Sequence, residues 1–207
     1  MYFEPYIEIA EQLSSADPAH DVLHVKRVFK NGQAILEKEL EADEEVVLTA
    51  ILLHELINLP KDHPFSSRSG DLCAELAGEL LETHQFPIEK REAVLTCIRH
   101  HSFSKGIVPK TIEEKIVQDA DRLDAMGAIG IARCFATSAA MKRPFYQEKD
   151  PFSKDRGLDG KGYAVDHFYQ KLLRLGDAMH TEAAKGMAQS RLEFMNHYLD
   201  QLDNELG

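Results

Sequence analysis

Apolar residues recur along most of this 207-residue chain at intervals of three and four, which is the period of a helix with one buried face. No segment shows the sustained two-residue alternation that is typical of a half-buried strand. The sequence therefore predicts an all-α protein. The predicted helices cover approximately residues 20–40, 44–56, 69–81, 87–98, 111–139, 163–175 and 181–206, and Asp17-Pro18 is the expected start signal of the first.

The predicted helix 111–139 differs from the others because it is apolar on nearly all sides, which indicates a central position. It nevertheless carries Asp119, Asp121 and Asp124. The segment 141–162 that follows is rich in proline, glycine and charged residues, and it is too long for a passive connection. We predict a single domain over residues 1–207, with residues 141–162 as a lid.

Charge and composition exclude several classes of protein. Lysine and arginine number 24 against 35 acidic residues, a net charge of −11, which argues against a protein that binds a nucleic-acid polymer. No apolar run reaches the roughly 18 residues of a membrane helix, and the N-terminus lacks a signal-peptide pattern. Cys73, Cys97 and Cys134 match no zinc or disulfide spacing, so we expect reduced, mostly buried thiols in a cytoplasmic protein.

Four ionisable residues lie at positions where the helical period predicts burial. His24 shares a face with the apolar positions four, eight and eleven residues later, and Asp121 lies four residues after Val117. His54 and Glu55 lie at the inner face of the predicted helix 44–56. Two imidazoles and two carboxylates from three helices are a reasonable ligand set for a divalent transition metal. Each residue alone is also explained as a satisfied core histidine or a paired carboxylate.

Four motifs occur in a fixed order: HDVLHVKRV at 20–28, LLHE at 52–55, RHHS at 99–102 and QDADRLDA at 118–125. In this order they resemble the motifs of the HD-domain phosphohydrolase superfamily. Three further motifs, NLPKDHP at 58–64, MGAIGIAR at 126–133 and DHFYQKLL at 166–173, are similar to those of a subgroup of small stand-alone bacterial HD proteins. The resemblance covers nearly the whole chain and implies an HD-type helical bundle.

The resemblance implies that His24, His54, Glu55 and Asp121 are the metal ligands. The family has His-Asp where this chain has His54-Glu55. Glutamate keeps the charge but adds one methylene, which moves the carboxylate by about 1 Å and is enough to affect the positioning of reacting groups. The expected metal is manganese, magnesium, cobalt, zinc or iron, since mixed histidine and carboxylate ligands discriminate poorly.

The remaining polar residues suit a phosphorylated substrate. A proline-bounded loop after the ligand pair is rich in cations and serines, and His101 has Lys105 and Lys110 nearby. The residues expected to bind substrate are Lys61, His63, Arg68, Ser69, His101, Arg122, His167 and Lys171. The residues expected to act in catalysis are Glu55, His101 and Asp124, where His101 lines the pocket, binds a second metal or protonates a leaving oxygen.

The leading hypothesis is a metal-dependent phosphohydrolase acting on a small phosphorylated molecule, most simply a nucleotide. By resemblance, nucleoside triphosphate pyrophosphohydrolysis is the favoured reaction. One alternative is a non-catalytic HD scaffold that binds metal and nucleotide, with Glu55 marking lost catalysis. Others are a di-iron protein, since helical bundles also hold two irons with such ligands, and a purely structural helical protein. The sequence sets no oligomeric state, and it indicates neither a membrane nor a nucleic-acid polymer as partner.

Overall fold

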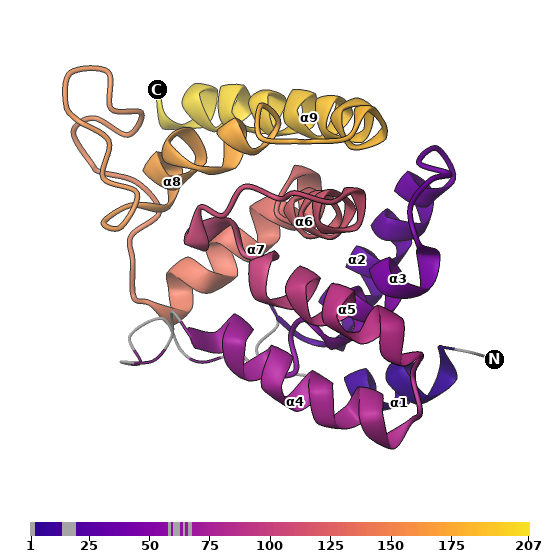
Figure 1. The fold of residues 1–207 in the computed structure, drawn as a ribbon. Coiled ribbons are helices and arrows are strands. Elements are labelled where there is room, and N and C mark those ends of the chain that lie inside the picture. Colours follow the sequence, from indigo (N-terminus) through magenta and orange to yellow (C-terminus); the bar gives the residue numbers. More distant parts are fainter. Residues whose placement is uncertain (1–2, 14–19, 58, 60–62, 64, 66–67) are drawn as a thin grey trace. The chain divides into compact units, whose positions relative to one another are not determined.

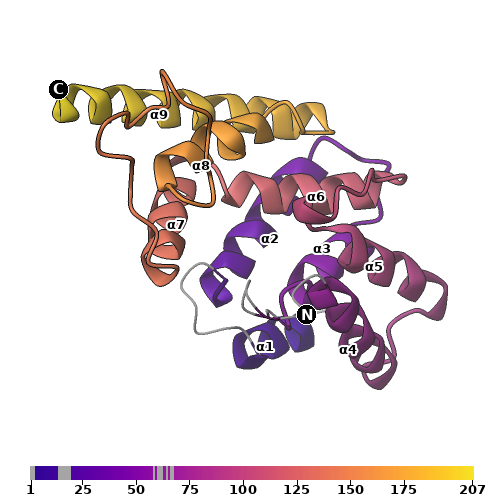
Figure 2. The ribbon, with the colours of Figure 1, turned by 90° about the vertical axis from the view of Figure 1, so that its left-hand side faces the viewer.

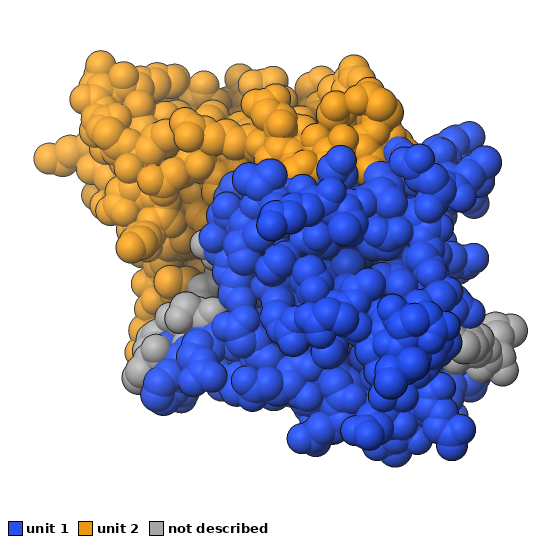
Figure 3. Space-filling model, viewed as in Figure 1, with its two compact units in different colours: residues 1–121 blue, residues 122–207 orange. Residues whose placement is uncertain are grey.

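The computed structural model describes residues 3–13, 20–57, 59, 63, 65 and 68–207. Every regular element in these ranges is a helix, so the all-α prediction is confirmed (Figure 1). The chain divides into two compact units, residues 1–121 and 122–207, which Figure 3 distinguishes by colour. The single domain with a lid at 141–162 stays a prediction. None of the described helices combines the length and apolar character needed to cross a membrane.

Unit 1 is built around a helix that is buried along almost its whole length. Its helices are α1 (Glu4–Leu13), α2 (Val22–Leu36), α3 (Glu44–Leu53), α4 (Ser69–Thr83), α5 (Ile88–His100) and α6 (Ile112–Asp124) as far as Asp121. All residues of α3 from Val46 to Leu53 are buried, and α3 packs against α2 and α5 (Figure 2). The helical pattern did not predict α1. α5 ends at His100, two residues after the predicted end at residue 98.

One side-chain cap and one close approach fix the position of α2. The Asp21 carboxylate accepts a hydrogen bond from the backbone N–H of His24, at 2.9 Å, and so begins the helix. Asp17 and Pro18 lie outside the described residues. At Gly32 an added Cβ would lie 2.5 Å from the Cδ1 of Ile51 on α3, so glycine lets these helices approach closely.

Unit 2 contains α7 (Gly127–Ala140), α8 (Ala164–Gln170), the short helix η3 (Leu172–Leu175) and α9 (Glu182–Leu206). α7 packs on α9, and Phe168 of α8 and Met195 of α9 are fully buried. The segment between α7 and α8 is fixed to α8 by Arg156, whose guanidinium contacts both carboxylate oxygens of the buried Asp166, at 2.5 and 2.8 Å. This pairing holds the pKa of the Asp166 carboxyl below its ordinary value, although burial alone would raise it.

The predicted single helix 111–139 is wrong in one respect, because α6 ends at Asp124 and α7 begins at Gly127. The backbone of Gly127 has a φ of 65°, in the left-handed region that favours glycine. An added Cβ there would lie 3.2 Å from the Cβ of Arg191, and the Arg191 guanidinium donates a hydrogen bond to the Leu123 carbonyl. The break is therefore built by a glycine and by an arginine from α9. The burial expected for this segment is confirmed in α6, where Ile116, Val117 and Ala120 are buried.

Candidate metal centre

Three of the predicted ligands come together in unit 1. His24 of α2, His54 directly after α3 and Asp121 of α6 each offer a ligand atom, and these atoms all lie within 4.8 Å of one another. The Oδ1 atom of Asp121 lies 3.5 Å from the Nε2 of His24 and 4.0 Å from the Nε2 of His54. Both histidines are buried, whereas the side chain of Asp121 is 23% exposed. We call these three residues the ligand cluster.

Two histidines are oriented by the carbonyl groups at the ends of their helices. α3 ends at Leu53, and the Nδ1 of His54 lies 2.6 Å from the Ile51 carbonyl oxygen. α5 ends at His100, and the Nδ1 of His101 lies 2.7 Å from the Ile98 carbonyl oxygen. A carbonyl only accepts, so Nδ1 carries the proton in both rings and Nε2 keeps its lone pair. Metal-binding histidines are commonly oriented in this way.

The electrostatics keep both rings neutral. Burial, the largest cause, together with the neighbouring His101 and His24 lowers the pKa of His54 to about 3, although Asp121 opposes the shift. Burial also lowers the pKa of His101. The ring centroids of His54 and His101 are 5.0 Å apart, and those of His24 and His54 are 5.4 Å apart. His54 and His101 are therefore neutral imidazoles, the form in which histidine binds a metal.

A divalent cation fits this donor set. The Nε2 of His54 is buried and has no hydrogen-bond partner among the described residues, an arrangement that normally costs free energy. A metal would remove that cost, and nitrogen and carboxylate oxygen suit several divalent metals. His24, His54 and Asp121 are the residues that would hold it.

Glu55 is not part of the ligand cluster. The sequence argument placed it one helical step beyond Ile51, but α3 ends at Leu53, so that register does not extend to residue 55. Glu55 is half-buried, and its charge interacts electrostatically with the thiol of Cys73 on α4. Burial raises the pKa of the Cys73 thiol to about 12, and the Glu55 charge contributes to the rise. The role of Glu55 as a ligand stays a prediction.

Sequence reasoning missed the polar residues that support the cluster. Asn31 of α2 is buried and donates a hydrogen bond to the Ala120 carbonyl, at 3.0 Å, directly before Asp121. Gln118 of α6 donates to the carbonyls of His100 and Ile107, at 2.7 and 3.1 Å. The available signal was a polar side chain on the buried face of an amphipathic helix, because Asn31 lies one turn after Val28.

The predicted substrate residues of unit 1 have different surroundings. His101 lies beside the ligand cluster. His63 and Arg68 are exposed, with an Arg68 Nη2 to Glu75 Oε1 distance of 3.9 Å, and Ser69 is the half-buried first residue of α4. Lys61 lies outside the described residues.

The remaining predicted residues belong to unit 2, and their roles stay predictions. Asp124 is buried and accepts a hydrogen bond from Arg133, at 2.9 Å. Arg122 is also buried, where it donates to the Ala178 carbonyl and contacts His180. His167 and Lys171 lie at the end of α8, and both are half-buried.

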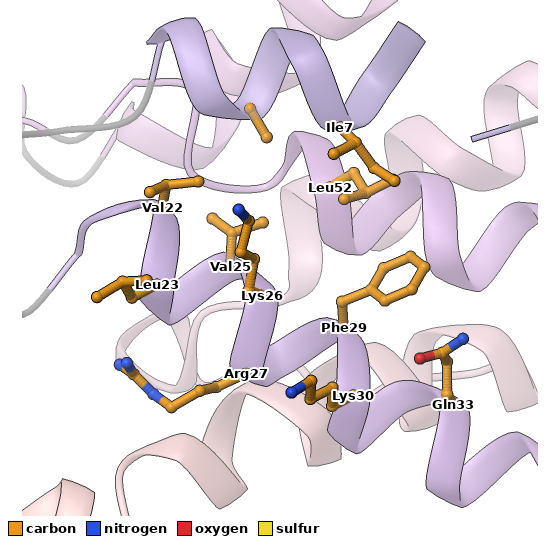
Figure 4. Close-up of a pocket in the computed structure, with 11 residues that line it drawn as sticks. Ile7, Val22, Leu23, Val25, Lys26, Arg27, Phe29, Lys30, Gln33 and Leu52 are labelled. Atoms are coloured by element: carbon orange, nitrogen blue, oxygen red, sulfur yellow. The ribbon is translucent and has the colours of Figure 1, made fainter. Parts of the chain in front are cut away.

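A separate apolar cavity of about 520 Å³ lies in unit 1 between α1, α2 and α3 (Figure 4). Its wall includes Val22, Phe29 and Leu52, and it has lysine side chains at its edge. The ligand cluster does not line this cavity. Its apolar wall offers no acid, base or metal ligand, so we assign the chemistry to the cluster.

This chain is similar to several known proteins. The HD domain model matches residues 22–126, which include all three cluster residues. The Bacillus subtilis protein YpgQ is 36% identical over 200 residues, 94% of this chain and 88% of YpgQ. The crystal structure of YpgQ in complex with ADP superposes with a TM-score of 0.74 over 97% of each chain. An HD-superfamily hydrolase from Bacillus thuringiensis is 33% identical, with a TM-score of 0.74 over 98% of this chain and 95% of that one. This chain belongs to the HD domain family.

Proposed function

We propose that this protein is a metal-dependent phosphohydrolase that acts on a nucleotide, with nucleoside triphosphate pyrophosphohydrolysis as the favoured reaction. The observation that carries the proposal is the ligand cluster, in which a buried, neutral His54 presents its Nε2 beside His24 and Asp121. The relative YpgQ, crystallised with ADP, supports a nucleotide as substrate, and the hydrolase from B. thuringiensis supports hydrolysis.

The residues of the chain have two roles, metal binding and proton transfer. A divalent metal bound there supplies a Lewis acid that polarises a phosphoryl oxygen and makes water more acidic. His24, His54 and Asp121 would hold it, and burial keeps His54 neutral, the form in which it can bind a metal. His101 presents an Nε2 lone pair next to His54, which suits a further ligand or the acceptor of a proton from water.

Phosphorus NMR of the products tests the proposal. Ribo- and deoxyribonucleotides are incubated with the protein and Mn²⁺, the manganese is removed before the spectrum is taken, and His54→Ala is compared with the exposed His197→Ala on α9. We expect pyrophosphate and nucleoside monophosphate from triphosphates, unchanged in His197→Ala and reduced at least a hundredfold in His54→Ala. Orthophosphate from monophosphates would instead indicate a nucleotidase. No product from any nucleotide, with metal bound, contradicts the proposal.

A second candidate, a scaffold that binds metal and nucleotide without turnover, is favoured by one observation. Glu55 replaces the family's aspartate and is not in the ligand cluster. In this case nucleotide binds but no product forms, and Glu55→Asp restores turnover. Equal turnover in the wild type and in Glu55→Asp would remove this candidate.

A further inference from the structure

We propose that Lys105 is a phosphate-binding residue of this site, and that Asp71 is its internal counter-ion, which the phosphate chain of the substrate displaces. Lys105 ends the short helix η2 (Phe103–Lys105), and its Nζ lies 2.8 Å from the Oδ1 of Asp71 in the first turn of α4. The inference rests on the proposed function, because it takes the ligand to be a phosphate ester.

The position of Lys105 is fixed by the turn that follows α5. Its backbone N–H donates to the Ser102 carbonyl, at 3.1 Å, and Gly106 N–H donates to the Phe103 carbonyl, at 3.1 Å. Gly106 has a φ of 63°, so the chain reverses there at little conformational cost. His101 and Lys105 therefore project from one short, hydrogen-bonded segment.

This turn brings the ammonium group near the backbone carbonyl that orients His101. A Cβ built on Gly70 would lie 3.5 Å from the Lys105 Nζ and also 3.5 Å from the Ile98 carbonyl oxygen. That carbonyl is the acceptor that orients His101, whose ring is next to His54.

The ion pair between Lys105 and Asp71 is asymmetric in exposure. The Lys105 side chain is 21% exposed and the Asp71 side chain is 44% exposed, so the carboxylate is the partner that water can take over. Released from Lys105, Asp71 stays in the first turn of α4, where the helix dipole favours a negative charge. An exchange of carboxylate for phosphate therefore costs little.

The chemistry of lysine suits this exchange. Its ammonium is a compact charge with three donors that adapts to any face of a phosphate, and a pyrophosphate group carries more charge than one carboxylate. In a chain of charge −11, this cation four residues after His101 offsets the repulsion that a phosphate chain would meet. When no substrate is bound, Asp71 neutralises the same cation.

A double-mutant cycle tests the proposal by binding, without reference to turnover. Isothermal titration of ADP and of inorganic pyrophosphate into Mn²⁺-loaded protein compares the wild type with Lys105→Met, Asp71→Asn and the double variant. We expect Lys105→Met to weaken binding about tenfold or more, and Asp71→Asn to tighten it about threefold. The double variant should match Lys105→Met, because Asp71 acts only through Lys105.

The control removes an ion-paired lysine elsewhere in unit 1. Lys90 Nζ lies 2.7 Å from the Oδ2 of Asp43, and Lys90→Met should leave both affinities within twofold of the wild type. If Asp71 and Lys105 only hold α4 to the turn, each variant lowers the melting temperature and Asp71→Asn does not tighten binding, which overturns the proposal. If neither ADP nor inorganic pyrophosphate binds measurably to the wild type, the proposal is overturned as well.

The outcomes separate this inference from the proposed function. Hydrolysis that depends on His54, combined with unchanged affinities in the cycle, overturns the role of Lys105 and leaves the phosphohydrolase in place. The expected cycle without any hydrolysis supports Lys105 as a phosphate-binding residue and removes the phosphohydrolase.

Discussion

At the scale of single residues, the neutral His54 makes the stability of the metal-free protein depend on pH. Its pKa is about 3 in the folded chain and 6.5 in an unfolded one, so below pH 6.5 the unfolded chain takes up a proton that the folded chain does not. The free energy of unfolding should fall as the pH is lowered from about 6.5 toward 3, by up to about 1.4 kcal/mol per pH unit from this residue. Urea unfolding at pH 7.5, 6 and 5 measures it, and His54→Gln should show a shallower dependence. If the free energy of unfolding changed with pH equally in the wild type and in His54→Gln, a neutral, buried His54 would be contradicted.

The buried side chain of Asn31 should affect both the stability of the fold and the affinity for Mn²⁺. Asn31→Ala removes the donor to the Ala120 carbonyl and leaves that buried group without it, so the free energy of unfolding should fall by about 1–3 kcal/mol. Because Ala120 precedes Asp121, Mn²⁺ affinity should fall too. Gln33→Ala, an exposed position on α2, is the control and should change both quantities little. Mn²⁺ affinity equal to that of the wild type would show that Asn31 supports only the fold.

At the scale of helices, periodicity predicted which segments are helical better than where they end. The inner faces of α2 and α3 follow from apolar spacing, and His24 lies on the buried face as predicted. The end of α3 does not follow, because Leu56 continues the apolar pattern after the helix has stopped at Leu53. The position of Glu55 could not be predicted for that reason. The break between α6 and α7 depends on Arg191, a residue more than 60 positions later.

The same break gives a prediction for Gly127. Gly127→Ala places a Cβ on a left-handed backbone and against Arg191, and should lower the free energy of unfolding by about 1–3 kcal/mol. Gly186→Ala on the exposed side of α9, where an added Cβ meets nothing within 4 Å, should raise it by about 0.5–1 kcal/mol. Chemical unfolding of both variants measures the difference. The same effect in both variants would show that the turn imposes no glycine requirement.

At the scale of the whole molecule, metal binding and folding stability are linked. The ligand cluster joins residues 24, 54 and 121, which an unfolded chain does not hold together. Mn²⁺ at about a hundred times its dissociation constant should therefore add about 2.7 kcal/mol to the free energy of unfolding, and EDTA should remove it. His54→Ala should lose most of this increment, while His197→Ala keeps it. A melting temperature of the wild type that does not respond to Mn²⁺ would argue against the site.

The helix-end contacts of His54 and His101 have a consequence for how the family can diverge. The acceptors that orient the two rings are main-chain carbonyls of Ile51 and Ile98, and every amino acid supplies the same carbonyl. Substitutions at positions 51 and 98 that preserve the helix therefore keep the protonation of the rings intact. The neighbouring sequence can drift with core packing, while the histidines themselves have no equivalent replacement. A centre of this kind therefore constrains only a few polar positions in the sequence, and the apolar positions around them can vary.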